Sequence, residues 1–173
     1  MGGIKKGQVA TDVAAKTNDT LLKSVAKVLQ IELSSVEGLT FQRKLRQDQI
    51  KSGVGSCEPD GGIWFYNNKP ICFFESKKQG KGGNAIERWF KNFTVLSRIN
   101  RNIQSGTFCV GEGTLKGAPI WKTLHEACDG QFDVVQEGNS VFMSLGDFDP
   151  NFVKETIKQI ILNSIEMNKL VLV

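Results

Sequence analysis

The segment PDGGIWFYNNKPICFFESKK, residues 59–78, decides the fold of this chain. Within it, two runs of aromatic and β-branched residues, Ile63–Tyr66 and Ile71–Phe74, flank the turn sequence NNKP at residues 67–70. Apolar runs of this kind on either side of a short polar turn predict a β-hairpin.

The pairing of this hairpin predicts that charged residues meet at its open end. If the turn lies midway between the two runs, Asp60 is opposite Ser76 and therefore between Glu75 and Lys77 on the neighbouring strand. Strand alternation places Glu75 and Lys77 on one face. The glycines that follow Asp60 predict a tight backbone position that a bound substrate can approach closely.

Two carboxylates and one ammonium group in this arrangement suit the hydrolysis of a phosphodiester. Mg²⁺ prefers oxygen ligands and keeps several waters, so Asp60, Glu75 and the Ser76 carbonyl are enough to hold it beside a phosphate. Lys77 is expected to orient or deprotonate the attacking water and to offset charge on the phosphate. We predict Asp60, Glu75 and Lys77 as catalytic. A solvated hairpin end with a surface ion pair is the alternative, because this spacing is common by chance.

Length and hydropathy predict one domain. A chain of 173 residues with 40% hydrophobic residues buries one ordinary core. We expect a helical part over about 1–52, the hairpin and a following helix over 53–103, and the remainder of the core over 104–173. There is no run of about 18 apolar residues and no apolar stretch near the start of the sequence. We therefore expect no membrane association and a cytoplasmic location.

Basic residues concentrate around the hairpin. Residues 41–101 hold 12 Lys and Arg against 5 Asp and Glu, whereas the whole chain holds 22 against 18. This asymmetry favours a polyanionic partner such as nucleic acid, although a solvated basic face would also account for it. The four cysteines lack metal-binding spacing and are expected to be reduced structural thiols. The single histidine, His125, has no marked nucleophile near it in the sequence, so a catalytic triad is not expected.

The periodicity of the remaining chain predicts a mixed α/β core. Residues 41–50 are basic and amphipathic. Helices are expected at Gln8–Leu33 (two helices, or one kinked at residues 17–19), Ala85–Ile103, Pro119–Ala127 and from Asp149-Pro150 to about Asn168. Further strands are expected at Thr107–Val110, Phe132–Val135 and Ser140–Leu145.

Three motifs in this order resemble those of the EcoRI-type restriction endonucleases: PDGGI at residues 59–63, ESKKQGK at 75–81 and GNAIER at 83–88. The first two also resemble the PD-(D/E)xK nuclease motif. The resemblance extends over Lys6 to about Asn92. It implies a restriction-endonuclease-like core, with a mixed central β-sheet flanked by helices. It also implies a Mg²⁺-dependent Type II endonuclease that acts as a homodimer on a palindromic site in double-stranded DNA.

The GNAIER motif carries the implied base recognition. The resemblance assigns reading of an AATT core to four residues where a helix begins: Asn84, Ala85, Glu87 and Arg88. Asn can pair bidentately with adenine, and Ala can contact a thymine methyl group. Gln79 and Lys81 match the stretch after the catalytic lysine and are candidate DNA contacts, although a solvated loop is equally consistent. Read alone, GNAIER is an ordinary Asn-capped helix start.

The chain also departs from the resemblance. Only residues 78–83 separate Lys77 from Asn84, and no segment after Arg101 corresponds to one that reads outer bases. The flanking bases are therefore unassigned. The leading hypothesis is cleavage within a site containing AATT, paired in the cell with a methyltransferase that protects the same site. The alternatives are a structure-selective repair or junction nuclease and a non-enzymatic DNA-binding protein that retains the fold.

Overall fold

The predicted hairpin forms the middle of a β-sheet. In the computed structural model, β2 (Ile63–Tyr66) pairs antiparallel with β3 (Lys69–Lys78). The two turn residues, Asn67 and Asn68, have φ of 48° and 63°. Asn tolerates this left-handed conformation, which a two-residue hairpin turn requires. The register shifts by one residue between Trp64 and Phe65, so the strands are not paired uniformly along their length.

The structure describes the backbone of residues 6–50, 56–78, 85–110, 135–137, 139–144 and 149–170. Within these ranges it describes the side chains except at 6–18, 47, 77–78, 85–90, 109–110, 135–137 and 139–144. The predicted helix at Pro119–Ala127, with His125 in it, lies outside the described residues.

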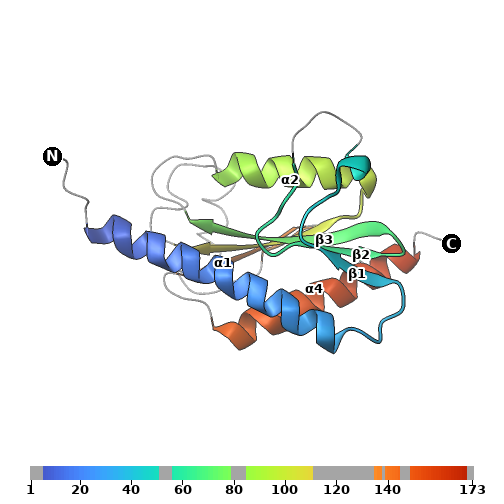
Figure 1. Ribbon diagram of the computed structural model, residues 1–173, viewed down its shortest axis with the longest axis horizontal. Coiled ribbons are helices and arrows are strands. Elements are labelled where there is room, and N and C mark those ends of the chain that lie inside the picture. Colours follow the sequence, from blue (N-terminus) through green and yellow to red (C-terminus); the bar gives the residue numbers. More distant parts are fainter. Residues whose placement is uncertain are drawn as a thin grey trace.

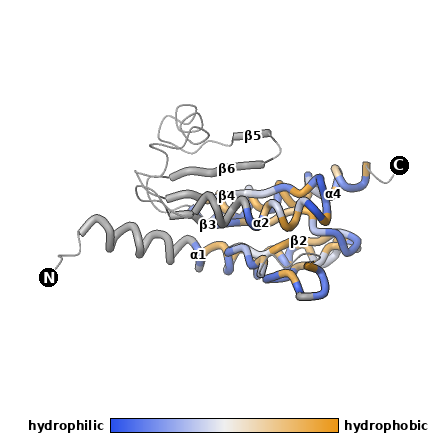
Figure 2. The backbone as a smooth tube through the Cα atoms, turned by 90° about the horizontal axis from the view of Figure 1, so that it is seen from above, coloured by the Kyte–Doolittle hydropathy of each residue, from blue (hydrophilic) through white to orange (hydrophobic). Residues whose placement is uncertain are grey.

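The hairpin is extended on both sides into a six-stranded mixed sheet with the order β1-β2-β3-β4-β6-β5. Figure 2, seen from above, shows hydrophobic residues along β2 and α4. The β2–β3, β1–β2 and β5–β6 pairs are antiparallel, and β3–β4 and β4–β6 are parallel. The other strands are β1 (Leu39–Gln42), β4 (Gln104–Val110), β5 (Val135–Glu137) and β6 (Asn139–Ser144).

Helices cover both faces of this sheet (Figure 1). The helix α2 (Ala85–Ile99) lies on one face, and α1 (Lys6–Glu32) and α4 (Pro150–Leu170) lie on the other. Alternate residues of β3 therefore enter two separate cores: Phe73 packs in the cluster beneath α2, and Phe74 in the cluster beneath α1 and α4. Burial on both faces explains why β3 is continuously apolar before its charged end. The predicted mixed α/β class is confirmed.

Two helix predictions near the ends of the chain differ in outcome. The start of α4 is confirmed, because Asp149 Oδ2 accepts the backbone N–H of Phe152 at 3.0 Å and Pro150 is the first helical residue. Of the two alternatives for the first helical part, two separate helices are wrong, because α1 is continuous from Lys6 to Glu32. The weak helix formers at residues 17–19 cost only about 0.5 kcal/mol each, which packing elsewhere along a long helix can offset.

The predicted end of α2 at Ile103 is also wrong, because the helix ends at Ile99. The Asn100 amide donates to the Pro70 carbonyl and to Asn168 Oδ1, both at 2.8 Å, and Asn100 Oδ1 accepts the N–H of Asn102 at 3.0 Å. These bonds turn the chain out of the helix and into β4.

Two strand predictions need correction, and a third falls mostly outside the described residues. No strand was predicted within Phe41–Ile50, but β1 ends there at Gln42 and a 3-10 helix spans Gln47–Gln49. The strand β4 begins three residues earlier than expected. Of the strand expected at Phe132–Val135, only Val135 is described, and it belongs to β5. Among the helices within the described ranges, none combines the length and the apolar character that crossing a bilayer requires.

Candidate functional site

A tight turn at residues 59–62 brings Asp60 beside the end of β3. The Gly61 N–H donates to the Phe74 carbonyl at 2.8 Å, and the Gly62 N–H donates to the Pro59 carbonyl at 3.0 Å. Asp60 Oδ2 accepts the backbone N–H of Ser76 at 3.0 Å. Asp60 therefore lies beside Ser76, as predicted, but it does so as a turn residue through its side chain and not as a paired strand residue.

The two glycines after Asp60 permit this approach. A Cβ atom on Gly61 would lie 2.7 Å from Phe74 Cβ, so a side chain there would push the turn away from β3. Gly62 has φ of 74°, and a Cβ atom on it would overlap the ring of Phe41 on β1. Both positions therefore require glycine, one because of space and the other because of space and backbone conformation.

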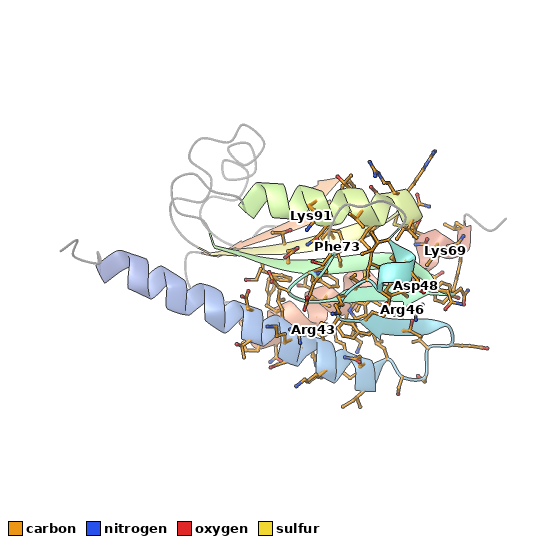
Figure 3. The ribbon with its side chains drawn as sticks, turned by 45° about the horizontal axis from the view of Figure 1, so that its top comes forward. Arg43, Arg46, Asp48, Lys69, Phe73 and Lys91 are labelled. Atoms are coloured by element: carbon orange, nitrogen blue, oxygen red, sulfur yellow. The ribbon has the colours of Figure 1, made fainter. Side chains whose placement is uncertain are left out.

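Glu75 is the second carboxylate, and it lies in the interior. Its side chain is 2% exposed, and Oε1 accepts a hydrogen bond from Asn92 Nδ2 on α2. Strand alternation puts Glu75 on the same face as Phe73, and Figure 3 shows Phe73 on β3 beneath α2. Burying a carboxylate costs several kcal/mol unless partners compensate it, so the amide of Asn92 offsets part of that cost.

The thiol of Cys57 is affected by the charge of Glu75. Cys57 is fully buried, and its pKa is raised to about 12, first by burial and then by the negative charge of Glu75, while Lys91 opposes the shift. Burial also raises the pKa of Cys72. Both are free thiols, as expected. Cys57 is therefore protonated near neutral pH and is a structural residue, with Glu75 and the exposed Lys91 in its vicinity.

Further oxygen atoms lie at this end of β3. The N–H and C=O of one strand residue point toward the same edge, so the Ser76 carbonyl faces the side on which Asp60 lies. Thr107 on β4 is paired in register with Glu75, and its hydroxyl is buried without a hydrogen-bond partner. The Ser76 hydroxyl is buried without a partner as well. Buried hydroxyls of this kind are suited to an ordered water.

The oxygen atoms at this end of β3 are of the kind that hard cations bind. Over the described residues, no group of three or more His, Cys, Asp and Glu gathers as a metal-binding cluster. A site for zinc or for calcium built wholly from side chains is therefore absent from that part of the chain. Two carboxylates with a backbone carbonyl suit Mg²⁺, which binds through one or two carboxylates and keeps several waters. Asp60, Glu75 and Ser76 supply these groups.

For the remaining predicted site residues, the structure describes the backbone of four and nothing of the other three. Lys77 is in β3, two residues after Glu75 and paired with Cys109 of β4, and its side chain is outside the described part. Ala85, Glu87 and Arg88 belong to the first turn of α2, and their side chains are also outside the described part. Three predicted DNA contacts fall outside the described residues altogether: Gln79, Lys81 and Asn84.

Asn92 was not identified from the sequence. It lies three residues after Trp89 and four before Leu96, so it interrupts the apolar stripe of α2 with an amide. A polar residue on the buried face of a helix needs a hydrogen-bond partner, and that interruption was the available signal. The partner, Glu75, is 17 residues away in sequence and becomes evident only when α2 is placed over β3.

Basic side chains lie near the turn. Arg43, just after β1, pairs with Glu58 at 3.0 Å, and both side chains are exposed. Figure 3 shows Arg43 and Arg46 on the segment that follows β1, and Lys91 on α2. Exposed pairs of this kind add little to stability, so their main effect is on the local potential.

The contact between Asp60 and Ser76 predicts a local change in amide exchange. Asp60→Ala removes the acceptor of the Ser76 N–H, so we expect that amide to exchange at least tenfold faster, as a lost hydrogen bond of about 1.4 kcal/mol implies. The measurement is amide hydrogen exchange followed by NMR. Asp48→Ala, at an exposed carboxylate beside Arg46, is the control and should leave Ser76 unchanged. Equal exchange at Ser76 in all three proteins would contradict the described turn.

Comparison of the chain with protein-family models, with curated proteins and with solved structures returned no significant match.

Proposed function

We propose that this chain is a Mg²⁺-dependent endonuclease that hydrolyses phosphodiester bonds of double-stranded DNA. One observation carries the proposal: Asp60 is hydrogen-bonded to Ser76, directly beside the buried Glu75, at the end of β3. The three-residue sequence Glu75-Ser76-Lys77 thereby has a second carboxylate fixed against its middle residue. A chance surface ion pair would leave Glu75 solvated, and its burial argues against that alternative.

The fold supports a restriction-endonuclease-like core. A mixed sheet with helices on both faces is the architecture that the motifs imply, and the central strand β3 ends in the charged sequence. We further propose the finer features of that family: a homodimer, a palindromic site with an AATT core, and a cognate methyltransferase. These rest on the PDGGI, ESKKQGK and GNAIER motifs.

In the proposed mechanism, Asp60, Glu75 and the Ser76 carbonyl would hold Mg²⁺. When bound, this cation lowers the pKa of a water and offsets negative charge on the phosphate. Lys77 orients the attacking water; as a neutral amine it also accepts the proton of that water, and the ammonium group so formed offsets the negative charge that the phosphate gains. The water oxygen joins the phosphorus, one P–O bond breaks and the leaving oxygen takes a proton from solvent, so the products are a 5′ or 3′ phosphate and a hydroxyl group. The Asp60–Ser76 bond keeps one carboxylate in place throughout.

The position of α2 supports base reading next to the scissile phosphate. Asn92 contacts Glu75, and Ala85 at the start of α2 is seven residues earlier, which is about 10 Å along a helix. Bases are stacked about 3.4 Å apart, so this corresponds to about three base pairs. A duplex lying along α2 would then have a phosphate near the end of β3 and base edges near the residues around Ala85. Helix starts also attract phosphates through free N–H groups.

Two other functions share parts of this site. A junction or repair nuclease would use the same carboxylates but recognise branched DNA, and a non-enzymatic DNA-binding protein would use only the basic surface. The burial of Glu75 beside Asp60 favours an enzyme, because a binding surface gains nothing from an enclosed carboxylate that repels phosphate.

The proposed activity predicts discrete DNA fragments. We expect the purified protein with Mg²⁺ to cut a plasmid of known sequence, and sequencing of the ends should place every cut within AATT. Lys77→Ala should lower the cleavage rate at least a hundredfold, since general acid–base and charge-stabilising groups contribute that much or more. Lys69→Ala, at the exposed first residue of β3, next to the hairpin turn, is the control and should cut normally.

The other outcomes separate the alternatives. Cutting of branched DNA with indifference to duplex sequence would replace the proposal with a junction nuclease. DNA binding without cutting of any substrate would replace it with a non-enzymatic role. Equal activity of the Lys77→Ala and wild-type proteins would show that the catalytic centre lies elsewhere.

Base reading by Asn84 predicts a loss of discrimination. In a Lys77→Ala background, Asn84→Ala should reduce the preference for an AATT duplex over a duplex with one changed A·T pair by about 1–3 kcal/mol, which is the contribution of one bidentate base contact. The dissociation constants of the two duplexes provide this quantity. Asn163→Ala, at an exposed residue of α4, is the control. Equal weakening on both duplexes would make Asn84 a backbone contact.

A further inference from the structure

A hydrogen bond links α2 to the buried carboxylate of the site. We propose that Asn92 is a positioning residue that orients Glu75 for the bound cation, and this inference rests on the proposed function. Asn92 is 7% exposed and Glu75 is 2% exposed, so water has little access to compete for the contact. The donor is Asn92 Nδ2 and the acceptor is Glu75 Oε1.

The chemistry of the pair explains why an amide is suited to this position. A lysine or arginine here would neutralise Glu75 and weaken its attraction for a cation, whereas an amide donates a hydrogen bond without adding a charge. An aliphatic residue would leave Oε1 buried without this donor. Groups that hydrogen-bond a metal-ligating carboxylate fix its orientation, and their removal typically costs 10–100-fold in metal affinity.

The neighbouring strand provides the opposite wall. Thr107 is paired with Glu75 across β3 and β4, so its side chain is on the same face of the sheet. Its buried hydroxyl has no protein partner. Glu75 therefore has a donor amide on α2 and a hydroxyl-bearing residue beside it on β4. The amide of Asn92 fixes the position of Glu75 Oε1. The hydroxyl of Thr107 is a polar group to which an ordered water can bind.

A second buried asparagine near the end of α2 separates this role from a structural one. Asn100 donates to the Pro70 carbonyl and to Asn168 Oδ1, both at 2.8 Å, so it joins the helix end to the hairpin and to α4. None of these partners is ionisable. Asn100 therefore matches Asn92 in residue type and burial but holds only the fold.

The test compares Asn92→Leu, Asn100→Leu and the wild type in single-turnover cleavage over a range of Mg²⁺ concentrations. Asn92→Leu should raise the half-saturating Mg²⁺ concentration at least tenfold, while the dissociation constant for the same DNA stays within twofold. Asn100→Leu should lower the melting temperature and leave the Mg²⁺ dependence within twofold. Asn92→Gln, which keeps the amide donor, should restore most of the wild-type Mg²⁺ dependence.

The outcomes distinguish this inference from the proposed function. Equal Mg²⁺ dependence of Asn92→Leu and the wild type would overturn the positioning role alone, because cleavage would still be present. A wild-type protein that cuts no DNA would overturn both. If Asn92→Leu does not fold, Asn92→Ala is used with the same expectation, since it removes the donor without introducing a larger apolar group. Equal increases of the half-saturating Mg²⁺ concentration in the Asn92→Leu and Asn100→Leu variants would show that Asn92 has only a structural role.

Discussion

The proposed site depends on the hydrogen bond that Asp60 accepts from the backbone N–H of Ser76. Asp60 belongs to a turn and Ser76 to a strand, so this bond forms only if the turn comes close to β3. Gly61 and Gly62 allow that approach, because a side chain at either would collide with Phe74 or Phe41. A one-residue slip of the strand would also exchange the faces of Glu75 and Ser76. Turn and register together therefore determine whether two carboxylates can serve one cation.

The rest of the fold keeps β3 in a fixed position. Phe73 and Phe74 are buried in opposite cores, so movement of the strand toward either layer is resisted. Glu75 follows these residues directly and is buried with them, although a carboxylate is costly to enclose. The protein retains it with an amide on α2, and the polar hydroxyl of Thr107 lies beside it on β4. In the proposed function, this arrangement makes a rigid carboxylate available at the edge of an otherwise apolar core.

The sequence predicts the parts of this molecule that rest on local chemistry. The hairpin, the capped start of α4 and the contact of Asp60 with Ser76 follow from short patterns, turn residues and strand pairing. It does not predict β1, because that strand is short and precedes a basic stretch, so only its pairing with β2 defines it. The end of α2 and the role of Asn92 were missed because their partners are distant in sequence. Long-range polar contacts have no periodicity to reveal them.

The location of a bound divalent ion tests the central claim most directly. In a titration with Mn²⁺, a paramagnetic substitute for Mg²⁺, we expect the backbone NMR signals of Gly61 and Ser76 to broaden first. Gly61 directly follows Asp60, and Ser76 directly follows Glu75 and donates its N–H to Asp60. The double variant Asp60→Asn, Glu75→Gln should abolish that broadening. Broadening centred on exposed acidic residues of α4, such as Glu155 or Glu166, would contradict the account, as would broadening at Gly61 and Ser76 that persists in the double variant.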